Sequence, residues 1–290
     1  MTVAQASTAH AQREASALVE PLDPQPIILL GAHRSGTTML GGFFSRVPGV
    51  AYFEEPRHIW TWGNAYTEDD RLDASHARPE VVNHIRRRFN AFMRKGKGSR
   101  FCEKTPSNCL RVPFVLTVYP QARLIHILRD GRAVVRSTVE ILHRHAPLWR
   151  IAERALKTSP REWLAYAPRA VRQISRKLAR RPMEFWGPRP PGWRQWVGRD
   201  PQHVMVARQW AGCALEAART GRALSAEQYL EVRYEDLMQR PRETLATLFE
   251  FARLSAPASL LDELASEVDP TRQDAWREAF TEEQLAQMRP

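Results

Sequence analysis

The chain has 290 residues and a formal net charge of +11, from 43 basic and 32 acidic side chains. Its 43% hydrophobic and 26% charged residues are typical of a globular protein. No apolar run reaches the roughly 18 residues of a membrane span. Three cysteines without zinc-site spacing argue against a disulfide framework and a structural metal site. The composition favours one large α/β domain or two small ones.

The N-terminal 25 residues lack the basic start and the apolar stretch of a secretory signal peptide. We therefore expect a disordered leader over residues 1–25, a single folded domain over residues 26–290, and a cytoplasmic protein. Only five of the 43 basic residues are Lys. An Arg- and Ala-rich composition of this kind is typical of GC-rich coding and indicates a bacterial source.

Short apolar runs alternate with helix-like stretches along most of the chain. The runs predict strands over residues 26–32, 50–55, 99–104, 123–129 and 228–234. Helices are predicted over residues 37–46, 79–95 and 131–145, with another after the last strand. Strands that alternate with helices pair in parallel, because each crossover returns the chain to the same end of the sheet. The sequence thus predicts an α/β layered fold with a central parallel sheet of about five strands flanked by helices.

The positive charge is concentrated in one segment. Residues 141–210 hold 15 basic and 4 acidic side chains and six of the nine tryptophans, whereas the rest of the chain is neutral. The stretch WGPRPPGW (residues 186–193) must form an irregular loop because of its Pro and Gly residues. We expect a helical, basic insertion here. Its tryptophans could pack between helices while its arginines only face solvent, or it could bind a nucleic-acid or membrane surface.

The loop GAHRSGTT (Gly31 to Thr38) follows the first strand and opens a helix. Its Gly-x-x-x-x-Gly skeleton is typical of a phosphate-binding loop, in which backbone N–H groups and a helix N-terminus hold an anion. A nucleotide triphosphatase needs Lys at the next position, where this chain has Thr37, and an Asp on a second strand for Mg²⁺. The loop therefore indicates a P-loop-type fold that is poorly suited to Mg-ATP, or an ordinary strand-to-helix turn.

Four motifs in chain order resemble those of sulfotransferases that use 3′-phosphoadenosine 5′-phosphosulfate (PAPS). GAHRSGTT is similar to their 5′-phosphosulfate loop, in the branch written Pro-Arg-Ser-Gly-Thr-Thr. RLIHILRDGRAVVRST (residues 123–138) resembles their 3′-phosphate-binding strand, turn and helix. EKTPSN (residues 103–108) and YLEVRYEDLMQRP (residues 229–241) resemble segments of the tyrosylprotein and glycan branch. The chain is identified as a bacterial-type member of this family, over residues 26–138 and 228–290.

The resemblance assigns residues to the donor PAPS. It implies donor binding by Arg34, Ser35, Gly36, Thr37, Thr38, Arg129, Ser137 and Tyr234. Arg129 and Ser137 are implied to hold the 3′-phosphate. Lys104 follows the third strand, and we expect it and Arg34 to neutralise the leaving phosphate oxygen. The residues alone leave two alternatives open: Lys104 as a solvated surface charge, and Arg129 paired with Asp130 at the surface.

The proposed base follows the second strand. Glu54 and Glu55 end that strand and are followed by Arg57. In the tyrosylprotein branch a Glu-Glu-x-Arg at this distance supplies the base and an assisting Arg, which implies Glu55 and Arg57 here. Glu54 and His58 remain alternative bases, and exposed glutamates after a strand could also be merely solvated.

The C-terminal part departs from the family pattern. The tyrosylprotein branch has a Lys just before a C-terminal Trp, where this chain has Ala275 before Trp276. Arg272 or Arg277 would have to replace that Lys in the donor site. The Gly-rich Arg-Lys-Gly loop of the cytosolic members is also missing from the sequence.

The resemblance predicts an enzyme that moves the sulfuryl group of PAPS to a hydroxyl of a small-molecule, glycan or lipid-linked acceptor. The transfer is expected to be in line, to release 3′-phosphoadenosine 5′-phosphate (PAP) and to need no metal. Two rival functions remain. One is a P-loop kinase or nucleotide hydrolase of related fold. The other is a basic protein that binds nucleic acid or a membrane.

The basic insertion is the candidate for the acceptor wall. A donor-binding core needs a separate wall or lid to orient the acceptor, and long insertions in α/β enzymes often supply one. The arginines and tryptophans of residues 141–210 suit an acceptor with anionic and flat parts, such as a glycan or glycolipid, and leave peripheral membrane contact open. Arg189 and Trp193 are expected to contact the acceptor without contributing to stability.

Overall fold

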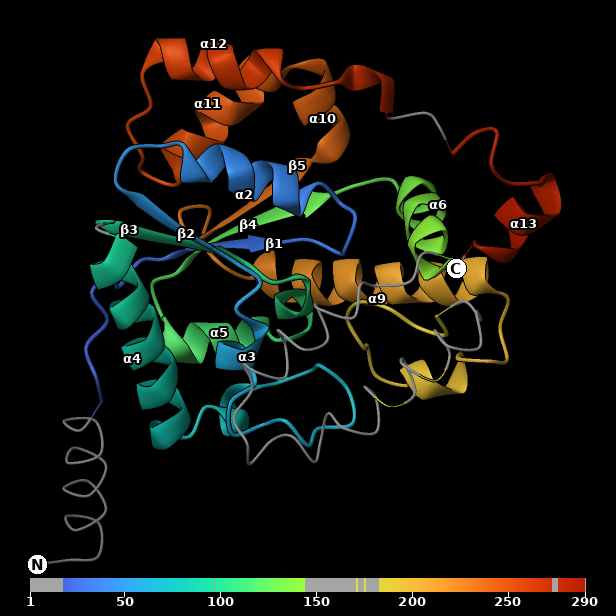
Figure 1. Cartoon of the computed structure of the whole chain (residues 1–290), viewed down its shortest axis with the longest axis horizontal. Helices are drawn as coiled ribbons and strands as arrows, with labels where there is room; N and C mark the ends of the chain where they lie inside the picture. Colours follow the sequence, from blue (N-terminus) through green and yellow to red (C-terminus); the bar gives the residue numbers. More distant parts are fainter. Residues whose placement is uncertain are drawn as a thin grey trace, which may run out of the picture.

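The computed structural model describes residues 18–96, 98–143, 171, 175, 183–272 and 276–289 (Figure 1). At its centre is a sheet of five parallel strands in the order β2-β3-β1-β4-β5. In chain order these are β1 (Ile27–Leu30), β2 (Val50–Glu54), β3 (Arg100–Lys104), β4 (Arg123–Leu128) and β5 (Tyr229–Arg233). Each lies inside a predicted strand, so the predicted α/β fold with a central parallel sheet is confirmed.

β1 lies at the centre of the sheet, where the strand order reverses. It pairs with β3 on one side and β4 on the other, and Ile27 lies opposite both Cys102 and Arg123. The chain places β2 and β3 to one side of β1, and then β4 and β5 to the other. Open α/β sheets bind ligands in the crevice beyond the carboxyl ends of the strands at such a reversal. The carboxyl ends of β1, β3 and β4 therefore mark the expected site.

Helices cover both faces of the sheet, as Figure 1 shows. One layer contains α2 (Thr37–Ser45), α10 (Tyr234–Gln239), α11 (Pro241–Phe251) and α12 (Ala258–Ser266), and the other contains α4 (Pro79–Gly96), α5 (Val112–Val118) and α9 (Gln202–Gly221). Side chains of β1 alternate between the two layers, with Ile27 and Leu29 in the first and Ile28 and Leu30 in the second. All four are completely buried, as expected for a central parallel strand.

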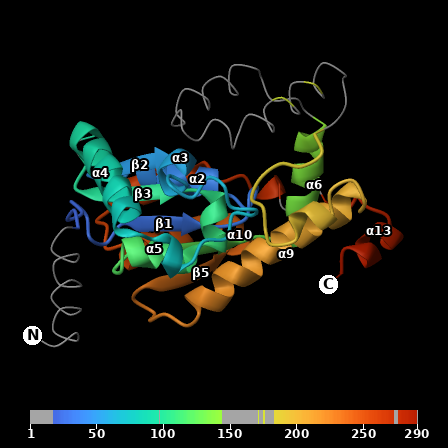
Figure 2. The same cartoon turned by 90° about the horizontal axis from the view of Figure 1, so that it is seen from below.

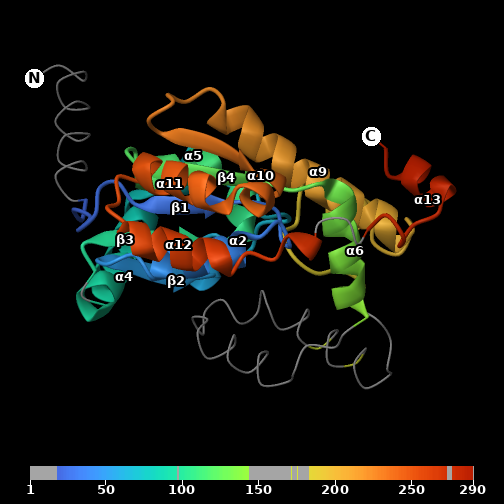
Figure 3. The ribbon, with the colours of Figure 1, turned by 90° about the horizontal axis from the view of Figure 1, so that it is seen from above.

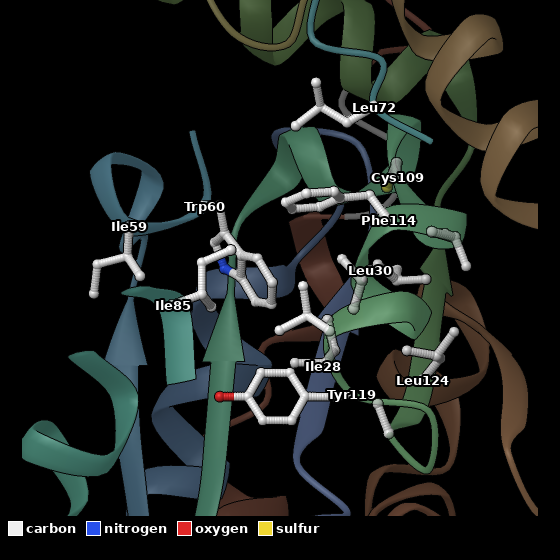
Figure 4. Packing of buried hydrophobic residues seen from close by; sticks show 14 of the residues in the cluster. Ile28, Leu30, Ile59, Trp60, Leu72, Ile85, Cys109, Phe114, Tyr119 and Leu124 are labelled. Carbon is white, nitrogen blue, oxygen red and sulfur yellow. The ribbon is translucent and has the colours of Figure 1, made fainter. Parts of the chain in front are cut away.

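The short helix α3 (Arg57–Trp60) is anchored by its last residue. Trp60 is completely buried, and it contacts the rings of Phe114 and Tyr119 edge-on in the second layer (Figure 4). Burying a large apolar side chain contributes roughly 1.5–3 kcal/mol. Trp60 therefore fixes α3, and with it the backbone of Arg57 at the helix start.

A third apolar cluster lies at one end of the molecule, where α6 (Gly131–Leu142) meets the beginning of α9 (Figures 2 and 3). Its buried members are Val135, Leu142, Met205 and Val206. Trp186 from the loop before α9, and Phe280 and Met288 from the C-terminal region around α13 (Glu282–Gln287), pack against it. The cluster thus gathers two late segments of the chain beside α6.

The predicted disordered leader is wrong for residues 18–25. The backbone N–H groups of Val19 and Leu22 donate to Asn83 Oδ1 (2.6 Å) and Asn90 Oδ1 (2.8 Å) of α4. Asp23 is buried and accepts from the backbone N–H of Phe101 (2.8 Å). These side chains of distant elements satisfy the leader's backbone, which its own composition did not indicate. Residues 1–17 lie outside the described residues.

The predicted insertion over residues 141–210 is only partly described. Residues 144–170 and most of 171–182 lie outside the described residues, so its helical character stays a prediction there. Residues 186–193 are irregular, as predicted, apart from the short helical turn η4 that begins at Trp193. The boundary at 210 is wrong, because α9 runs through it and contacts β4 and β5. None of the described helices is both long and apolar enough to cross a membrane.

Candidate active site

The loop from Gly31 to Thr38 turns tightly at the carboxyl end of β1. Arg34 and Gly36 have positive φ angles of 65° and 91°, and α2 begins directly after them at Thr37. A Cβ on Gly36 would lie 2.6 Å from the ring of Tyr234, so glycine is required there. The start of α2 carries neither a side-chain cap nor an acidic residue in its first turn. Its N–H groups are therefore available to an anion.

Four predicted donor-binding residues meet here: Arg34 of this loop, Arg129 after β4, Ser137 of α6 and Tyr234 of α10. Arg34 Nε donates to Ser137 Oγ of α6 at 2.9 Å. Arg129, at the end of β4, donates to the backbone oxygen of Arg34 at 3.0 Å, and its guanidinium lies 4.2 Å from the ring centre of Tyr234. The Asp130 carboxylate, the alternative partner of Arg129, caps α6 and pairs with Arg132. Two guanidiniums therefore converge beside the helix N-terminus.

Lys104 ends β3 with a side chain that is only 1% exposed, so the alternative of a solvated surface charge is wrong. Its Nζ donates to Glu55 Oε1 (2.7 Å), Thr38 Oγ1 (3.0 Å) and Glu54 Oε1 (3.3 Å). An ammonium has three N–H donors, and all three have partners here. Lys104 thus connects the anion-binding loop to the two glutamates.

Glu55 is held in an unusual backbone conformation. Its φ is +48°, and such strain costs on the order of 1–3 kcal/mol in a non-glycine residue. Its N–H donates to the backbone oxygen of Lys104 (2.8 Å), while its own oxygen accepts from the N–H of Arg57 (2.7 Å). The side chain is 49% exposed and closer to Lys104 than Glu54 is. A carboxylate that is both accessible and fixed beside a buried cation suits a proton acceptor.

His58, the runner-up base, lies in the first turn of α3 on the side of α4. Burial, the charge of Arg88 and the charge of His58 lower the pKa of His84 of α4 to about 4. The ring of His84 stacks on Trp62 with centres 4.1 Å apart. The charge of His58 thus acts on His84 of α4, whereas Glu55 is bonded to Lys104.

The EKTPSN segment is a closed network of side chains. Glu103 is fully buried and accepts from Asn108 (2.6 Å) and Thr105 (2.8 Å). Burial raises the pKa of Glu103 to about 7. Glu103 and Lys104 are neighbours in a strand and so face opposite sides of the sheet. The motif thus combines a structural glutamate with a lysine that faces the site.

Arg57 extends to a carboxylate that the sequence did not single out. Its NH2 lies 2.5 Å from Asp70 Oδ2, and Asp70 also accepts from the Ser107 hydroxyl (3.0 Å) and the Arg189 side chain (2.6 Å). Arg111 is completely buried nearby, and its two terminal nitrogens have no hydrogen-bond partner among the described residues. Burial lowers the pKa of Arg111 to about 10, so it remains charged at neutral pH. Asp70 lies in the acid-rich sequence EDDRLD (residues 68–73). Such a sequence is typical of a solvent-exposed turn, so nothing in it marked Asp70 as buried.

Arg189 and Trp193, which we expected to contact the acceptor without contributing to stability, both bond to the loop around Asp70. The Arg189 side chain is 12% exposed because it is paired with Asp70. Pro188 and Pro190 on either side are buried. Trp193 Nε1 donates to the backbone oxygen of Glu68 at 3.1 Å. The loop 186–193 has an irregular backbone, but its side chains bond to the loop around Asp70.

His33 joins the donor loop to the same segment. It is buried, its ring meets Trp186 edge-on at 5.2 Å, and neither ring nitrogen has a hydrogen-bond partner among the described residues. Burial, with the charge of Arg34, lowers the pKa of His33 to about 3. Gln209 Nε2 holds the segment by donating to the backbone oxygens of Trp186 (2.9 Å) and Pro188 (2.6 Å).

The C-terminal Trp276 is buried against α6. The Arg132 guanidinium lies 3.6 Å from its ring centre, and the Arg277 guanidinium lies 5.0 Å from it. Residues 273–275 and the side chain of Arg272 lie outside the described residues. Of the two predicted replacements for the missing Lys, Arg277 therefore lies at Trp276, and Arg132 joins it as a cation that sequence reasoning missed.

Comparisons with known proteins agree on one family. The model of the sulfotransferase family matches residues 26–188, which is more than half of the chain. Protein-tyrosine sulfotransferase 1 of Danio rerio is 29% identical over 125 residues, which cover 39% of this chain and 35% of that protein. Protein-tyrosine sulfotransferase A of Caenorhabditis elegans is 29% identical over 123 residues, which cover 39% and 32%. The match thus spans about a third of the length of these curated relatives.

Solved structures share the fold. The sulfotransferase domain from the curacin biosynthetic pathway has a TM-score of 0.55 at 14% identity, covering 92% of this chain and 97% of that domain. The sulfotransferase domain of the Synechococcus PCC 7002 olefin synthase has a TM-score of 0.54 at 17% identity, covering 93% and 94%. The likeness extends over nearly the whole length of both domains.

Proposed function

The chain belongs to the sulfotransferase family, and from this premise we propose that it transfers the sulfuryl group of PAPS to a hydroxyl of a separate acceptor. The observation that carries the proposal is the connection made by Lys104. One buried ammonium contacts the anion-binding loop at Thr38 and the strained Glu55. Donor loop, leaving-group cation and base are thereby adjacent, as sulfuryl transfer requires.

The donor side suits PAPS by charge. Arg34 and the free N–H groups at the start of α2 would hold the 5′-phosphosulfate. Arg129 and Ser137 would hold the 3′-phosphate, with Tyr234 packed on Arg129. Charge-assisted hydrogen bonds to a phosphate are each worth about 1.5–3 kcal/mol. The two guanidiniums and the start of α2 therefore match the charge of a donor with two phosphate groups.

Each catalytic side chain has one role in the proposed transfer. PAPS supplies the sulfuryl group, whose bond to the 5′-phosphate oxygen breaks as the acceptor oxygen attacks in line. Lys104 and Arg34 neutralise the charge that grows on the leaving oxygen. Glu55 takes the proton of the attacking hydroxyl. Arg57 assists on the acceptor side.

The acceptor side carries an excess of positive charge. Three guanidiniums, those of Arg57, Arg111 and Arg189, surround the carboxylate of Asp70. We therefore propose an acceptor that carries an anionic group near its hydroxyl, whether a small molecule, a glycan or a lipid. The relatives in fish and nematode are named for protein tyrosine, so an acidic tyrosine peptide is included among the first acceptors to test.

Thermal stabilisation in EDTA tests the proposed donor. A ligand at 100 times its Kd stabilises a protein by about 2.7 kcal/mol, so PAP should raise the melting temperature clearly. ADP lacks the 3′-phosphate and should do so much less. Stabilisation by Mg-ATP but not by PAP would instead support the kinase or hydrolase alternative. Stabilisation only by polyanions would support a nucleic-acid-binding protein.

A further inference from the structure

Asp70 connects three distant parts of the chain beside the acceptor side of the site. It lies in the loop between α3 and α4, and its side chain is 1% exposed. The Asp70 carboxylate accepts from Arg57 (2.5 Å), from Ser107 (3.0 Å), and from Arg189 through NH2 (2.6 Å), Nε (3.1 Å) and the backbone N–H (3.0 Å). Asp70 also donates its own N–H to the backbone oxygen of Arg189 (2.8 Å).

These contacts saturate the carboxylate. A carboxylate offers about four acceptor sites, and five donors reach this one. Burial alone would raise the pKa of Asp70, but the charges of Arg57, Arg189 and Arg111 hold it well below its usual range. Asp70 is therefore a permanent, fixed negative charge among guanidiniums.

Asp70 determines the position of the Arg57 guanidinium. The backbone from Glu55 to Arg57 is already fixed, by the bonds of Glu55 to Lys104 and Arg57 and by the buried Trp60 at the end of α3. Only the long Arg57 side chain, which is 44% exposed, then remains to be placed. Without a partner at Asp70, its guanidinium would be drawn to the carboxylate of Glu55, two residues earlier. That contact would occupy the proposed base.

We propose that Asp70 is a positioning residue of the acceptor side, which holds Arg57 away from Glu55 and clamps residues 183–190 to the site through Arg189. This role rests on the proposed sulfuryl transfer. Asp70 thereby connects residues 183–190 to the region of Glu55 through one buried carboxylate. A change in residues 183–190 should therefore alter the position of Arg57 beside Glu55.

The first test replaces the charge and keeps the shape. For Asp70→Asn we expect kcat to fall by about 10²-fold, the cost of a roughly 1 Å misplacement in an active site. The reaction is measured as transfer of ³⁵S from [³⁵S]PAPS to an acidic tyrosine peptide, per folded enzyme. Asp73→Asn is the matched control, because its carboxylate bonds Ser75 and His76 within its own turn. Equal kcat for Asp70→Asn and the wild type would overturn the proposal.

A double-mutant cycle separates positioning from general stability. If Asp70 acts through Arg57, adding Asp70→Asn to Arg57→Gln should reduce kcat little further, because contacting residues are not additive. Multiplied losses would show that Asp70 does not act through Arg57. Should Asp70→Asn fail to fold, Asp70→Glu keeps the buried charge but moves it; we expect a loss of kcat there too, and wild-type kcat would contradict us.

The clamp on residues 183–190 has a readout that needs no acceptor. Trypsin should cut after the exposed Arg194 faster in Asp70→Asn than in Asp73→Asn, and equal rates would contradict the clamp. Stabilisation of the wild type by PAP reports on the donor site alone. Absence of that stabilisation would mean that the proposed function has failed, whereas normal PAP binding with unchanged kcat in the Asp70 variants would refute only the positioning role.

Discussion

The donor side and the acceptor side of this site are held together by different kinds of contact. On the donor side, Arg34 and Arg129 each follow a strand of the central sheet within a few residues, so the sheet brings them together. On the acceptor side, the central carboxylate Asp70 lies in a loop, and its partner Arg189 is 119 residues away. The donor side therefore follows from strand order, whereas the acceptor side depends on one buried ionic network.

The largest expected effect lies where the two sides meet. Glu55→Gln should reduce turnover about 10²–10⁴-fold, because the amide cannot take the acceptor proton. PAP affinity should stay unchanged, as measured by calorimetry. Glu54→Gln and His58→Ala are the controls and should lose much less. An active Glu55→Gln together with an inactive His58→Ala would move the base to His58.

The acceptor side should depend on its ionic network for stability. Arg189→Ala removes the main partner of a buried carboxylate and should cost about 3–5 kcal/mol of unfolding free energy, measured by urea denaturation. Arg194→Ala, five residues on, is the matched control; its side chain is 61% exposed, and it should cost less than about 0.5 kcal/mol. Equal costs would show that Asp70 is held well enough by Arg57 and Ser107.

The donor side should instead show its effect in ligand selectivity. Arg129→Gln should weaken PAP by about 1.5–3 kcal/mol, the value of one charge-assisted contact, and leave ADP nearly unaffected. Calorimetry in EDTA measures both. Arg136→Gln, on α6 and paired with Glu140, should change neither. Equal weakening of PAP and ADP would remove Arg129 from the 3′-phosphate site.

The smallest expected effect is the pH dependence of the unfolding free energy, which should come from His33 on the donor side and not from Asp70 on the acceptor side. The pKa of the buried His33 is about 3, so between pH 6.5 and 5 only the unfolded state takes up a proton at this position. Unfolding free energy should therefore fall by about 1.6 kcal/mol from His33 as the pH decreases over this range. His33→Asn should remove that loss. Asp70 is ionised in the folded and the unfolded protein above pH 5. Asp70→Asn should therefore keep the loss of unfolding free energy between pH 6.5 and 5, and absence of that loss in Asp70→Asn would contradict its assignment to His33.

The predicted fold was confirmed because each part of it is a local pattern. The five strands are short apolar runs. In β1 every residue is apolar, and all four are buried in the structure. The donor loop was found in the same way, since the spacing of Gly31 and Gly36 indicates an anion-binding turn. Helix α9 was missed, because its first half was counted with the basic insertion and its partners α6 and β4 lie elsewhere in the chain.

The sequence predicted only those site residues that lie within a recognised motif. Lys104, Glu55 and Arg129 follow strands in the recognised motifs, and the parallel sheet places them at one edge. The burial of Lys104 and its contact with Thr38 could not be read from EKTPSN, which would look the same with the lysine in solvent. His33, Arg132 and Asp70 were missed, since no periodicity marks a residue whose partners come from other elements.

What the sequence determined by itself is the order of the strands along the chain, the anion-binding loop and the cations that follow β1 and β4. These depend on hydrophobic periodicity and on turn residues within a few positions of one another. Only the tertiary structure decided which carboxylate would hold Arg57 and that most of the Arg189 side chain would be covered. Such pairings join residues up to 119 positions apart, and the burial that makes a charge pair strong exists only once the chain has folded around it.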